Sequence, residues 1–383
     1  MTKVLFVSHS SELYGAERML LDTLRNLDRG KFSPVLAVPR SGPLTDAAAQ
    51  AGIDWLTLPM KWTLTEPGRV WKQPLSRLLN VRGIRAAVRL IRDREIGLVV
   101  TNTAAVWTGA LAARRAGVPH VWLIHEILDG KRPLLKYVFG RKRLVRRMAR
   151  LSKLIIANSG ASARAFSGSG KVVVIGNGIA VRTGPAPDAA AIRRSFGIES
   201  GVPAMGIVAK IYPGKGQLEA VRAADILRRS WPELKLLVVG DVKDARYEGR
   251  VRAEVGRLGL DRDVLFLGRR DDLDAILAAL DVLIVASSVD SLGRVAMEGM
   301  AAGTPVVAAA AGGIPEVVRD GETGLLVASP EPDLLAAGVA RVLDDPGLAR
   351  RLREGGRRFV EANYSLEAQA RKIDRALEGC LEA

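Results

Sequence analysis

The chain has 383 residues, and its 57 Lys and Arg against 41 Asp and Glu give a formal net charge of +16. Apolar residues make up 48% and charged residues 26%, which is an ordinary globular composition and excludes extensive disorder. The single cysteine, Cys380, excludes an internal disulfide and a metal site built from thiolates. This length predicts two or three domains, each with its own core.

The positive charge is confined to one half of the chain. Residues 1–178 hold 29 Lys and Arg and 11 Asp and Glu, whereas residues 179–383 hold 28 and 30. Such an excess points to nucleic acid, an anionic membrane or phosphorylated small molecules as partners. We therefore expect any such partner to bind the first half of the chain.

The ends of the chain and its longest apolar runs suggest no membrane insertion. The apolar run that begins after Lys3 ends at His9, which is too short for a signal peptide. No run of about 18 apolar residues lacks a polar break. We therefore expect a cytoplasmic protein. Peripheral association with the inner face of the membrane is compatible with this expectation.

Short apolar runs alternate with longer helical patterns along the whole chain. Uninterrupted β-branched runs predict strands buried on both faces, and the alternation predicts parallel sheets with right-handed crossovers. The predicted strands are 3–8, 34–39, 97–101, 119–124, 153–158 and 172–175, and then 203–209, 234–240, 263–268, 281–286, 305–309 and 324–328.

The strand and helix pattern runs through twice, which predicts two doubly wound, Rossmann-like domains. We place them at 1–180 and 192–365, joined by a Pro/Gly/Ala linker at 181–191. A helix at 366–383 follows, and it crosses back to the first domain in our interpretation. Ligands of such sheets lie at the carboxyl ends of the strands, so we expect the site in the cleft between the domains.

Neither domain carries the dinucleotide fingerprint. The loop after the first strand reads Ser8-His9-Ser10-Ser11-Glu12, without glycine, and Glu219 stands where the third glycine after Gly214 and Gly216 would be. A Walker A pattern is also absent from the sequence. Nicotinamide redox chemistry and P-loop hydrolysis are thereby disfavoured.

Two acids with seven residues between them, Asp290 and Glu298, lie around a predicted helix start at Gly293. Backbone N–H groups from Leu292 through Arg294 to Val295 would form a site for an anion or a hydroxyl oxygen. Ionised carboxylates beside it accept hydrogen bonds from sugar hydroxyls. The alternative is that Asp290 only caps the helix and Glu298 is a solvated surface acid.

The residues after these acids carry a family resemblance. Glu298-Gly-Met-Ala-Ala-Gly-Thr-Pro-Val-Val and Gly312-Gly-Ile-Pro-Glu-Val317 resemble the signature of retaining glycosyltransferase family 4, whose members have the two-domain GT-B fold. The resemblance implies that Asp290 lies near the donor sugar and that Glu298 binds the nucleotide ribose. The sequence departs from the family pattern at two positions, where Asp290 replaces a glutamate and Leu292 replaces an aromatic residue.

A second resemblance lies in Ile207-Val-Ala-Lys-Ile-Tyr-Pro-Gly-Lys-Gly-Gln217, where the family usually has Arg and Lys. It implies that Lys210 and Lys215 neutralise the departing diphosphate, which requires fixed cations and no metal. Lysine is a point charge and does not grip phosphate bidentately. Either lysine alone is equally typical of an ordinary surface turn.

The first domain offers three further matches. His125-Glu126 follows a strand and resembles a family pair whose His contacts the donor sugar. The loop Leu13-Tyr-Gly-Ala-Glu-Arg18 resembles the family's Gly-Gly-Ala-Glu turn, with Gly15 open to ligand phosphate and Tyr14 in place of the first glycine. The turn Asn177-Gly178 resembles the family's Asn-Gly, but without the following acid, and we interpret it as structural.

The resemblance implies a retaining, metal-independent transferase of the hexosyl type. A nucleotide-diphosphate sugar is its co-substrate, and no other cofactor is implied. The first domain is then the acceptor side and the second the donor domain, and closure brings His125 to the donor residues. The acceptor is a glycan or a lipid-linked molecule, as in polysaccharide biosynthesis.

The basic half contains two clusters. Residues 131–153 hold ten Lys and Arg, no acid and an apolar stripe at helical spacing, which is typical either of a helix on anionic lipid or of a helix packed on its own sheet. Arg82, Arg85, Arg89 and Arg92 line one helix face. Trp55, Trp62 and Trp71 lie in a Pro/Gly-broken stretch at 55–74 that is either an acceptor lip or an irregular connection.

Other functions remain open at this point. A nucleotide-sugar epimerase of the same fold would convert the donor without an acceptor, and a catalytically inactive relative would act as a binding partner. A nucleic-acid-binding protein is disfavoured, because aromatic residues make up only 5% and no recognition motif is present.

Overall fold

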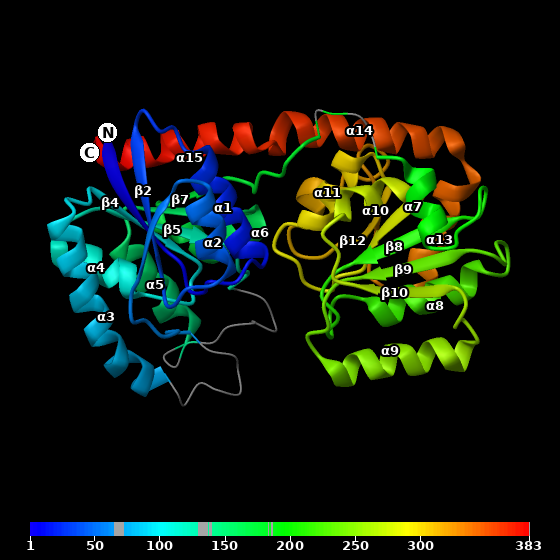
Figure 1. Ribbon diagram of the computed structural model, residues 1–383, viewed down its shortest axis with the longest axis horizontal. Coiled ribbons are helices and arrows are strands. Elements are labelled where there is room, and N and C mark those ends of the chain that lie inside the picture. The colour runs from blue at the N-terminus through cyan, green and yellow to red at the C-terminus, as the bar shows by residue number, and fades with distance from the viewer. Residues whose placement is uncertain (65–72, 129–136, 138–139, 183, 185–186, 383) are drawn as a thin grey trace. The chain divides into compact units, whose positions relative to one another are not determined.

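The computed structural model describes residues 1–64, 73–128, 137, 140–182, 184 and 187–382, and side chains are described for all of these except 73–79 (Figure 1). The chain forms two compact units. The first unit is Met1–Gly178 together with Leu366–Ala383, and the second is Ile179–Ser365. Each unit is built on one sheet, and each is taken by itself below.

The first unit has a seven-stranded parallel sheet in the order β3-β2-β1-β4-β5-β6-β7. The order reverses between β1 and β4, so ligand-binding loops are expected at the carboxyl ends there. Its elements are β1 Thr2–Val7, α1 Gly15–Asn26, β2 Phe32–Val38, α2 Pro43–Gln50, β3 Asp54–Thr57, α3 Gln73–Asp93, β4 Leu98–Asn102, α4 Thr108–Ala116, β5 His120–Ile124, α5 Arg141–Leu151, β6 Leu154–Ala157, α6 Gly160–Ala163, the 3₁₀ helix Arg164–Ser169, β7 Val172–Val174 and α15 Leu366–Leu381.

Successive residues of each strand face opposite layers of helices. Val4 and Phe6 of β1 pack in a core with α1, α2 and α15, whereas Leu5 and Val7 pack in a core with α3 and α4. Trp122 of β5, fully buried, packs with α4 and α5. Helices therefore cover both faces of the sheet, with α3, α4 and α5 on one face (Figure 1).

The second unit has a six-stranded parallel sheet in the order β10-β9-β8-β11-β12-β13. Here the order reverses between β8 and β11. Its elements are α7 Ala189–Ser195, β8 Ala204–Val208, α8 Gln217–Leu227, β9 Lys235–Val239, α9 Ala245–Leu258, β10 Val264–Gly268, α10 Leu273–Ala279, β11 Val282–Val285, α11 Arg294–Ala302, β12 Val306–Ala309, α12 Ile314–Val317, β13 Leu325–Val327, α13 Pro332–Asp344 and α14 Pro346–Tyr364.

Each of the twelve apolar runs contains a strand, and the predicted two-sheet α/β fold is confirmed. The sequence pattern missed β3, which places Trp55 in a strand and not in an irregular connection. This edge strand has four residues, and none of them is fully buried. It lacks the continuous apolar run of a strand covered on both faces. Trp71 lies outside the described residues.

The basic segment 131–153 proves to be a packed helix over its described part. Residues 141–151 form α5, and its apolar side chains Leu144 and Met148 are buried against Trp107 and Trp122. The apolar stripe that we considered for contact with lipid is therefore in the core in α5. Residues 131–136 and 138–139 lie outside the described part.

The terminal helix α15 packs with the first unit. Its residues Ile373, Leu377 and Cys380 are buried in the same core as α1 and β1. Lys31 Nζ lies 2.6 Å from Glu378 Oε1, and the Asp28 N–H donates to Asp374 Oδ1 at 3.4 Å. The last residues of the chain thereby complete the N-terminal core. No helix within the described residues has the length and apolar character needed to cross a membrane.

Candidate functional site

In the second unit, the turn after β8 is pressed against the end of β11. Gly216, at φ 85°, is the N-cap of α8, and a Cβ atom there would lie 2.3 Å from Ala286 Cβ. No side chain fits, so only glycine allows this approach. The Ser288 N–H also donates to Gly214 O at 3.0 Å. The two loops are thus held side by side at the carboxyl ends of neighbouring strands.

This approach brings Lys215 to Asp290, two of the predicted site residues. Lys215 Nζ donates to Asp290 Oδ2 at 2.9 Å and to Ser287 Oγ at 3.3 Å. Both side chains of the ion pair are about four-fifths buried. Within the described residues, two of the three N–H groups of this ammonium are used, and one is left for an oxygen of a ligand.

Asp290 also holds the start of α11. Its Oδ1 accepts from the Leu292 N–H at 3.2 Å and from the Gly293 N–H at 2.8 Å, and its carbonyl accepts from the Gly313 N–H at 2.9 Å. The helix begins after Gly293, as the sequence predicts. However, the Leu292 and Gly293 amides, which we expected to face a ligand, are occupied by Asp290. Asp290 therefore does cap the helix, as the alternative interpretation predicts, and it also pairs with Lys215.

The electrostatics keep this pair ionised. Burial opposes the charged form of Asp290, but the Lys215 charge and the hydrogen bonds from Lys215, Gly293 and Leu292 outweigh it and lower the Asp290 pKa below its usual value. Burial likewise opposes the charge on Lys215, and the Asp290 carboxylate outweighs it and raises the Lys215 pKa. A fixed cation thus lies at the end of the strands at neutral pH.

Glu298 is neither solvated nor without a partner. Arg294 Nε donates to Glu298 Oε1 at 2.9 Å across one turn of α11, and both side chains are about four-fifths buried. The solvated-acid alternative for Glu298 is therefore wrong. Val295 lies half-buried beside them in the first turn of the helix. The pair fixes the Glu298 carboxylate, and among the described residues its Oε2 is left to accept from a hydroxyl group.

Lys210 lies at the other end of the same turn. Its side chain is half-buried, and its carbonyl accepts from Gln217 Nε2 at 3.0 Å. Gln217 is fully buried, so the backbone at Lys210 is tied to the start of α8. The predicted role of the Lys210 side chain with phosphate stays a prediction.

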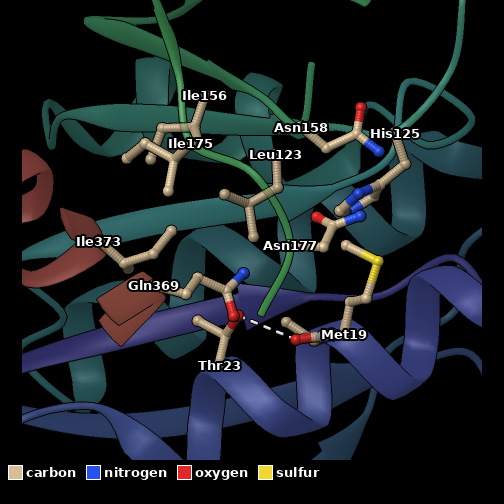
Figure 2. Close-up of a pocket in the computed structure, with 11 residues that line it drawn as sticks. Met19, Thr23, Leu123, His125, Ile156, Asn158, Ile175, Asn177, Gln369 and Ile373 are labelled. Atoms are coloured by element: carbon tan, nitrogen blue, oxygen red, sulfur yellow. Dashed lines mark hydrogen bonds between the residues drawn. The ribbon is translucent and has the colours of Figure 1, made fainter. Parts of the chain in front are cut away.

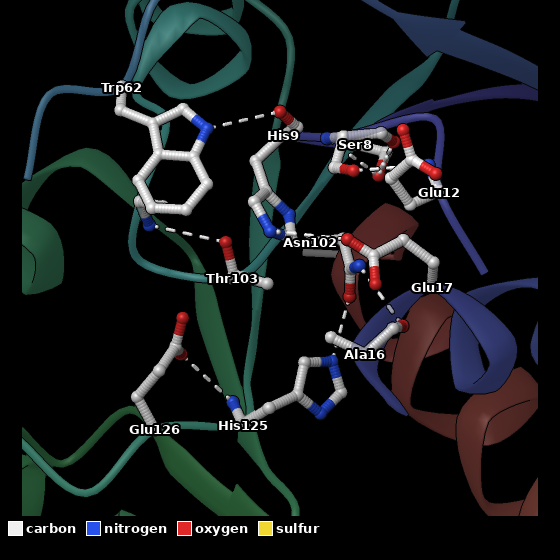
Figure 3. Close-up of polar contacts among 12 residues, drawn as sticks. Ser8, His9, Glu12, Ala16, Glu17, Trp62, Asn102, Thr103, His125 and Glu126 are labelled. Atoms are coloured by element: carbon white, nitrogen blue, oxygen red, sulfur yellow. Dashed lines mark hydrogen bonds and ion pairs between the residues drawn. The ribbon is translucent and has the colours of Figure 1, made fainter. Parts of the chain in front are cut away.

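In the first unit, polar side chains gather where β1, β4 and β5 end (Figure 3). Asn102, the last residue of β4, is fully buried and donates through Nδ2 to Ala16 O at 3.3 Å. Its Oδ1 lies 2.7 Å from His125 Nε2. Because Oδ1 only accepts, His125 Nε2 carries the hydrogen, and His125 Nδ1 is left as an acceptor. Burial, reinforced by His9, lowers the His125 pKa to about 3, so the ring is neutral.

His125 Nδ1 is buried and has no hydrogen-bond partner within the described residues. A cavity of about 10 Å³ adjoins His125 and is also lined by Asn158, Asn177 and Gln369 (Figure 2). This volume holds about one water molecule. Asn177, which we interpreted as structural, therefore borders the same space as His125.

A second histidine lies beside this network. His9 Nε2 is 3.2 Å from Glu17 Oε1, whose side chain is 2% exposed. Trp62 covers His9, with ring centroids 5.2 Å apart, and its Nε1–H donates to the His9 carbonyl at 3.3 Å (Figure 3). Burial lowers the His9 pKa to about 4. Glu17 thus orients a neutral imidazole at the end of β1.

Glu126 is held by backbone amides. It accepts from the Ala104 N–H at 3.2 Å and from its neighbour His125 N–H at 3.1 Å, and burial raises its pKa to about 7. The loop that supplies Ala104 contains Thr103 at φ 73°, a strained conformation for a β-branched residue. Strain at the end of β4 therefore accompanies the contact that fixes Glu126.

Gly15 is the first residue of α1, and a Cβ atom there would meet nothing within 4 Å. The free protein therefore has room for a side chain at Gly15. The sequence predicts that glycine is needed here for the close approach of a ligand, and this role of Gly15 stays a prediction.

A groove of about 660 Å³ opens over the ends of β1, β2 and β3. Its wall includes His9, Trp62 and the basic residues Arg40, Lys61 and Arg82. Asn80 of α3 ties the wall together, because its side chain bonds both the N–H of Lys61, at 2.7 Å, and its carbonyl, at 3.0 Å. The groove presents cations and an aromatic ring to whatever enters it.

His9, Asn102 and Ser287 belong to these clusters although the sequence did not predict them as site residues. Each follows or ends a buried strand, as His125 does, and that position was the signal available in the sequence. Within the described ranges, no three His, Cys, Asp or Glu side chains are grouped so as to hold a metal ion.

Known proteins match both units. A family model described as glycosyl transferases group 1 matches residues 188–359, and one described as glycosyltransferase family 4 matches residues 14–182. The D-inositol 3-phosphate glycosyltransferase of Actinosynnema mirum is 33% identical over 298 residues, which are 72% of this chain and 68% of that protein. A GDP-mannose-dependent monoacylated alpha-(1-6)-phosphatidylinositol monomannoside mannosyltransferase of Corynebacterium glutamicum is 33% identical over 202 residues, 50% of this chain and 51% of that protein. The first curated relatives are matched over 39% to 68% of their lengths.

Among solved structures, HepE of Anabaena in complex with UDP and glucose superposes with a TM-score of 0.83 and 26% identity, covering 99% of this chain and 100% of that one. A sucrose-phosphate synthase of Thermosynechococcus elongatus, 20% identical, shares the fold with a TM-score of 0.78 over 99% of both chains. Because the family models and these relatives cover both sheets, the chain belongs to the group 1 glycosyltransferases, of the family 4 type, and has their two-domain GT-B fold.

Proposed function

We propose that this glycosyltransferase transfers a sugar from a nucleotide-diphosphate donor to an acceptor with retention of configuration. The observation that carries the proposal is Lys215, fixed by Asp290 and Ser287 at the strand ends beside the start of α11. A cation and a helix N-terminus together suit the charge that develops on a leaving diphosphate. HepE, a structural relative, was solved with UDP and with UDP-glucose, which supports a donor of this class.

In the proposed reaction, the bond from the anomeric carbon to the diphosphate oxygen breaks, and its electron pair stays on that oxygen. The acceptor hydroxyl oxygen bonds to the anomeric carbon on the same face, and its proton passes to the leaving diphosphate. No side chain has to act as a nucleophile in this route. Lys215 stabilises the diphosphate without a metal ion, because its ammonium is already charged and placed.

We assign three further residues by the family resemblance and their positions. Glu298, fixed by Arg294, binds the ribose hydroxyls through its remaining oxygen. His125, neutral and held by Asn102, contacts the donor sugar through Nδ1 as an acceptor. Lys210 is the second cation for the diphosphate.

The acceptor belongs in the groove of the first unit. Arg40, Lys61 and Arg82 favour an acceptor that carries a phosphate, and Trp62 offers an apolar face for a sugar or cyclitol ring. Relatives that act on D-inositol 3-phosphate or on a phosphatidylinositol mannoside support an anionic acceptor. Whether that phosphate is free or part of a lipid is a question for the assay.

The test of the donor site is a pair of lysine variants. Thermal shift with UDP, GDP and ADP identifies the base, and donor hydrolysis is then followed with the matching nucleotide sugars in the presence of EDTA. We expect Lys215→Ala to lower the rate by at least about a hundredfold, the usual effect of losing one charge-stabilising group.

Lys235→Ala is the matched control, because Lys235 pairs with Asp263 at 2.7 Å with nearly the same exposure as Lys215. It should retain full activity. Failure of all nucleotides to bind, equal rates for the two variants, or complete loss of activity in EDTA would each contradict the proposal. Isomerisation of the donor sugar in the absence of an acceptor would show an epimerase instead.

A further inference from the structure

The cation of the proposed donor site has an acid beside it. Lys215 Nζ donates to Asp290 Oδ2 at 2.9 Å, and both side chains are about four-fifths buried. The Lys215 pKa is raised and the Asp290 pKa is lowered, so both groups are charged at neutral pH. An anion that reaches Lys215 therefore meets a carboxylate together with the ammonium.

The Asp290 carboxylate is held in this place and does not turn freely away from an incoming anion. Its Oδ1 accepts from the Leu292 N–H at 3.2 Å and from the Gly293 N–H at 2.8 Å. The Asp290 carbonyl accepts from the Gly313 N–H at 2.9 Å, which fixes the backbone of the same residue. Rotation of the side chain would break the hydrogen bonds that cap α11, so it costs stability.

The shape of the ammonium group sets the distance between Asp290 and a bound anion. Two acceptors on neighbouring N–H groups of one ammonium lie about 5 Å apart, because each is about 2.9 Å from the nitrogen in a tetrahedral arrangement. A phosphate oxygen on the N–H group of Lys215 that no described residue uses therefore lies near Asp290 Oδ2. The Debye length at 0.1 M salt is about 10 Å, and the pair is largely buried, so salt and water screen the repulsion only in part.

Repulsion by Asp290 affects the product more than the donor. In the donor, one oxygen of the diphosphate is bonded to the sugar. In the proposed reaction this oxygen leaves and takes up the acceptor's proton, which a terminal phosphate loses again near neutral pH because its second pKa is about 6. The product thus carries more negative charge than the donor at the same place, and without an opposing charge Lys215 would hold it more tightly. Product release limits the turnover of many enzymes.

We propose that Asp290 limits the affinity of the donor site for the nucleoside diphosphate product and so promotes its release. This inference rests on the proposed function, in which Lys215 contacts the diphosphate. Asp290 also positions Lys215, and the two roles have opposite consequences for binding. If positioning dominated, removal of the carboxylate would free the lysine and weaken the nucleotide complex, whereas removal of a repelling charge strengthens it.

The test is the affinity of the full chain for UDP, GDP or ADP, whichever gives the largest thermal shift, measured by calorimetric titration. Asp290→Asn keeps an oxygen for the Leu292 and Gly293 amides, and we expect it to bind the diphosphate at least about fivefold more tightly than wild type. The dissociation rate, followed by surface plasmon resonance, should fall with it, because affinity differences between related complexes lie mainly there. Asp290→Ser, which also keeps a capping oxygen, should act in the same direction. Asp290→Glu restores the charge and should bind as weakly as wild type.

Asp263→Asn is the matched control, because Asp263 pairs with Lys235 at 2.7 Å with nearly the same exposure, at the amino ends of β9 and β10. It changes the net charge equally and should leave the nucleotide affinity unchanged. Weaker or unchanged binding by the two neutral Asp290 variants, with unfolding temperatures that show folded protein, would overturn the proposal, as would equal tightening by Asp263→Asn. If Lys215→Ala leaves the nucleotide affinity unchanged, the donor assignment itself fails. If Lys215→Ala weakens binding but the neutral Asp290 variants do not tighten it, only this inference fails.

Discussion

At the residue scale, Asp290 shows how one side chain has two roles. One oxygen receives the amides of Leu292 and Gly293 at the start of α11, and the other receives the ammonium of Lys215. Asp is short enough to reach both from the loop, whereas Glu, the family residue at this position, has one more methylene group. The departure from the family pattern is therefore consistent with a carboxylate held close to the backbone.

Asp290→Asn separates the two roles. The amide oxygen still accepts from Leu292 and Gly293, but the charge opposite Lys215 is lost, so we expect the free energy of unfolding to fall by about 1–2 kcal/mol at pH 7. Denaturant unfolding at several pH values measures it. The Asp290 pKa is lowered in the folded protein, so its stabilisation is complete above the unfolded pKa near 3.8 and is lost as the pH falls below it.

The difference between wild type and Asp290→Asn should therefore shrink below about pH 4. A difference that is constant with pH would show that the carboxylate charge contributes nothing. Asp290→Ala, which also removes the cap, should cost about 1 kcal/mol more than Asp290→Asn.

At the scale of elements, a few close approaches decide where the loops lie. Gly216 brings the turn after β8 against the end of β11, and without this contact Lys215 and Asp290 would not meet. In the first unit, Asn102 joins the end of β4 to both α1 and His125. In each unit the candidate site therefore depends on how the loops pack against one another. The strands only bring these loops close together.

Gly216→Ala tests this dependence. The added methyl group would overlap Ala286 Cβ and O, and φ 85° is unfavourable for alanine, so we expect a loss of about 2–4 kcal/mol in the stability of the second unit together with loss of nucleotide binding. Gly249→Ala is the control, because Gly249 lies within α9 and a Cβ atom there meets nothing within 4 Å. That variant should be stabilised by up to about 1 kcal/mol. A Gly216→Ala protein as stable as wild type would contradict the packing argument.

At the scale of the whole molecule, we expect the stability of the two units to respond differently to acid. The chain's three histidines, His9, His120 and His125, all lie in the first unit, and burial lowers their pKa values to about 4, 3 and 3. Below pH 6.5 the three imidazoles take up protons in the unfolded chain but not in the folded chain. The free energy of unfolding is therefore expected to fall as the pH decreases through this range. Glu126, with its pKa raised to about 7, acts in the opposite direction, but it is one group against three.

We therefore expect the first unit to lose stability selectively between pH 7.5 and pH 5.5. Five of the six tryptophans lie in this unit, and Trp231 alone lies in the second, so tryptophan fluorescence reports mainly on the first unit. On acidification, the thermal midpoint measured by tryptophan fluorescence should fall by more than the midpoint measured by far-ultraviolet circular dichroism. Equal shifts by the two probes would contradict the assignment of the effect to the buried histidines.

Much of the fold followed from local pattern. Continuous β-branched runs identified twelve strands, and their alternation with helices identified two doubly wound sheets, because a strand covered on both faces needs such a run wherever it lies. β3 lacked the run because it is a short strand at the edge. The start of α11 and the glycine-bounded turn before α8 were likewise visible, since caps and turns depend on residues only a few positions apart.

The sequence by itself therefore determined every strand except β3, the fold class, several of the candidate residues and the confinement of positive charge to the first half. Only the tertiary structure decided which residues meet: Lys215 with Asp290, Asn102 with His125, and α15 with α1. It also decided that the apolar side of α5 is buried and its basic side exposed. These outcomes depend on contacts between segments far apart in the chain, and no local pattern of residue types encodes which segments pack together.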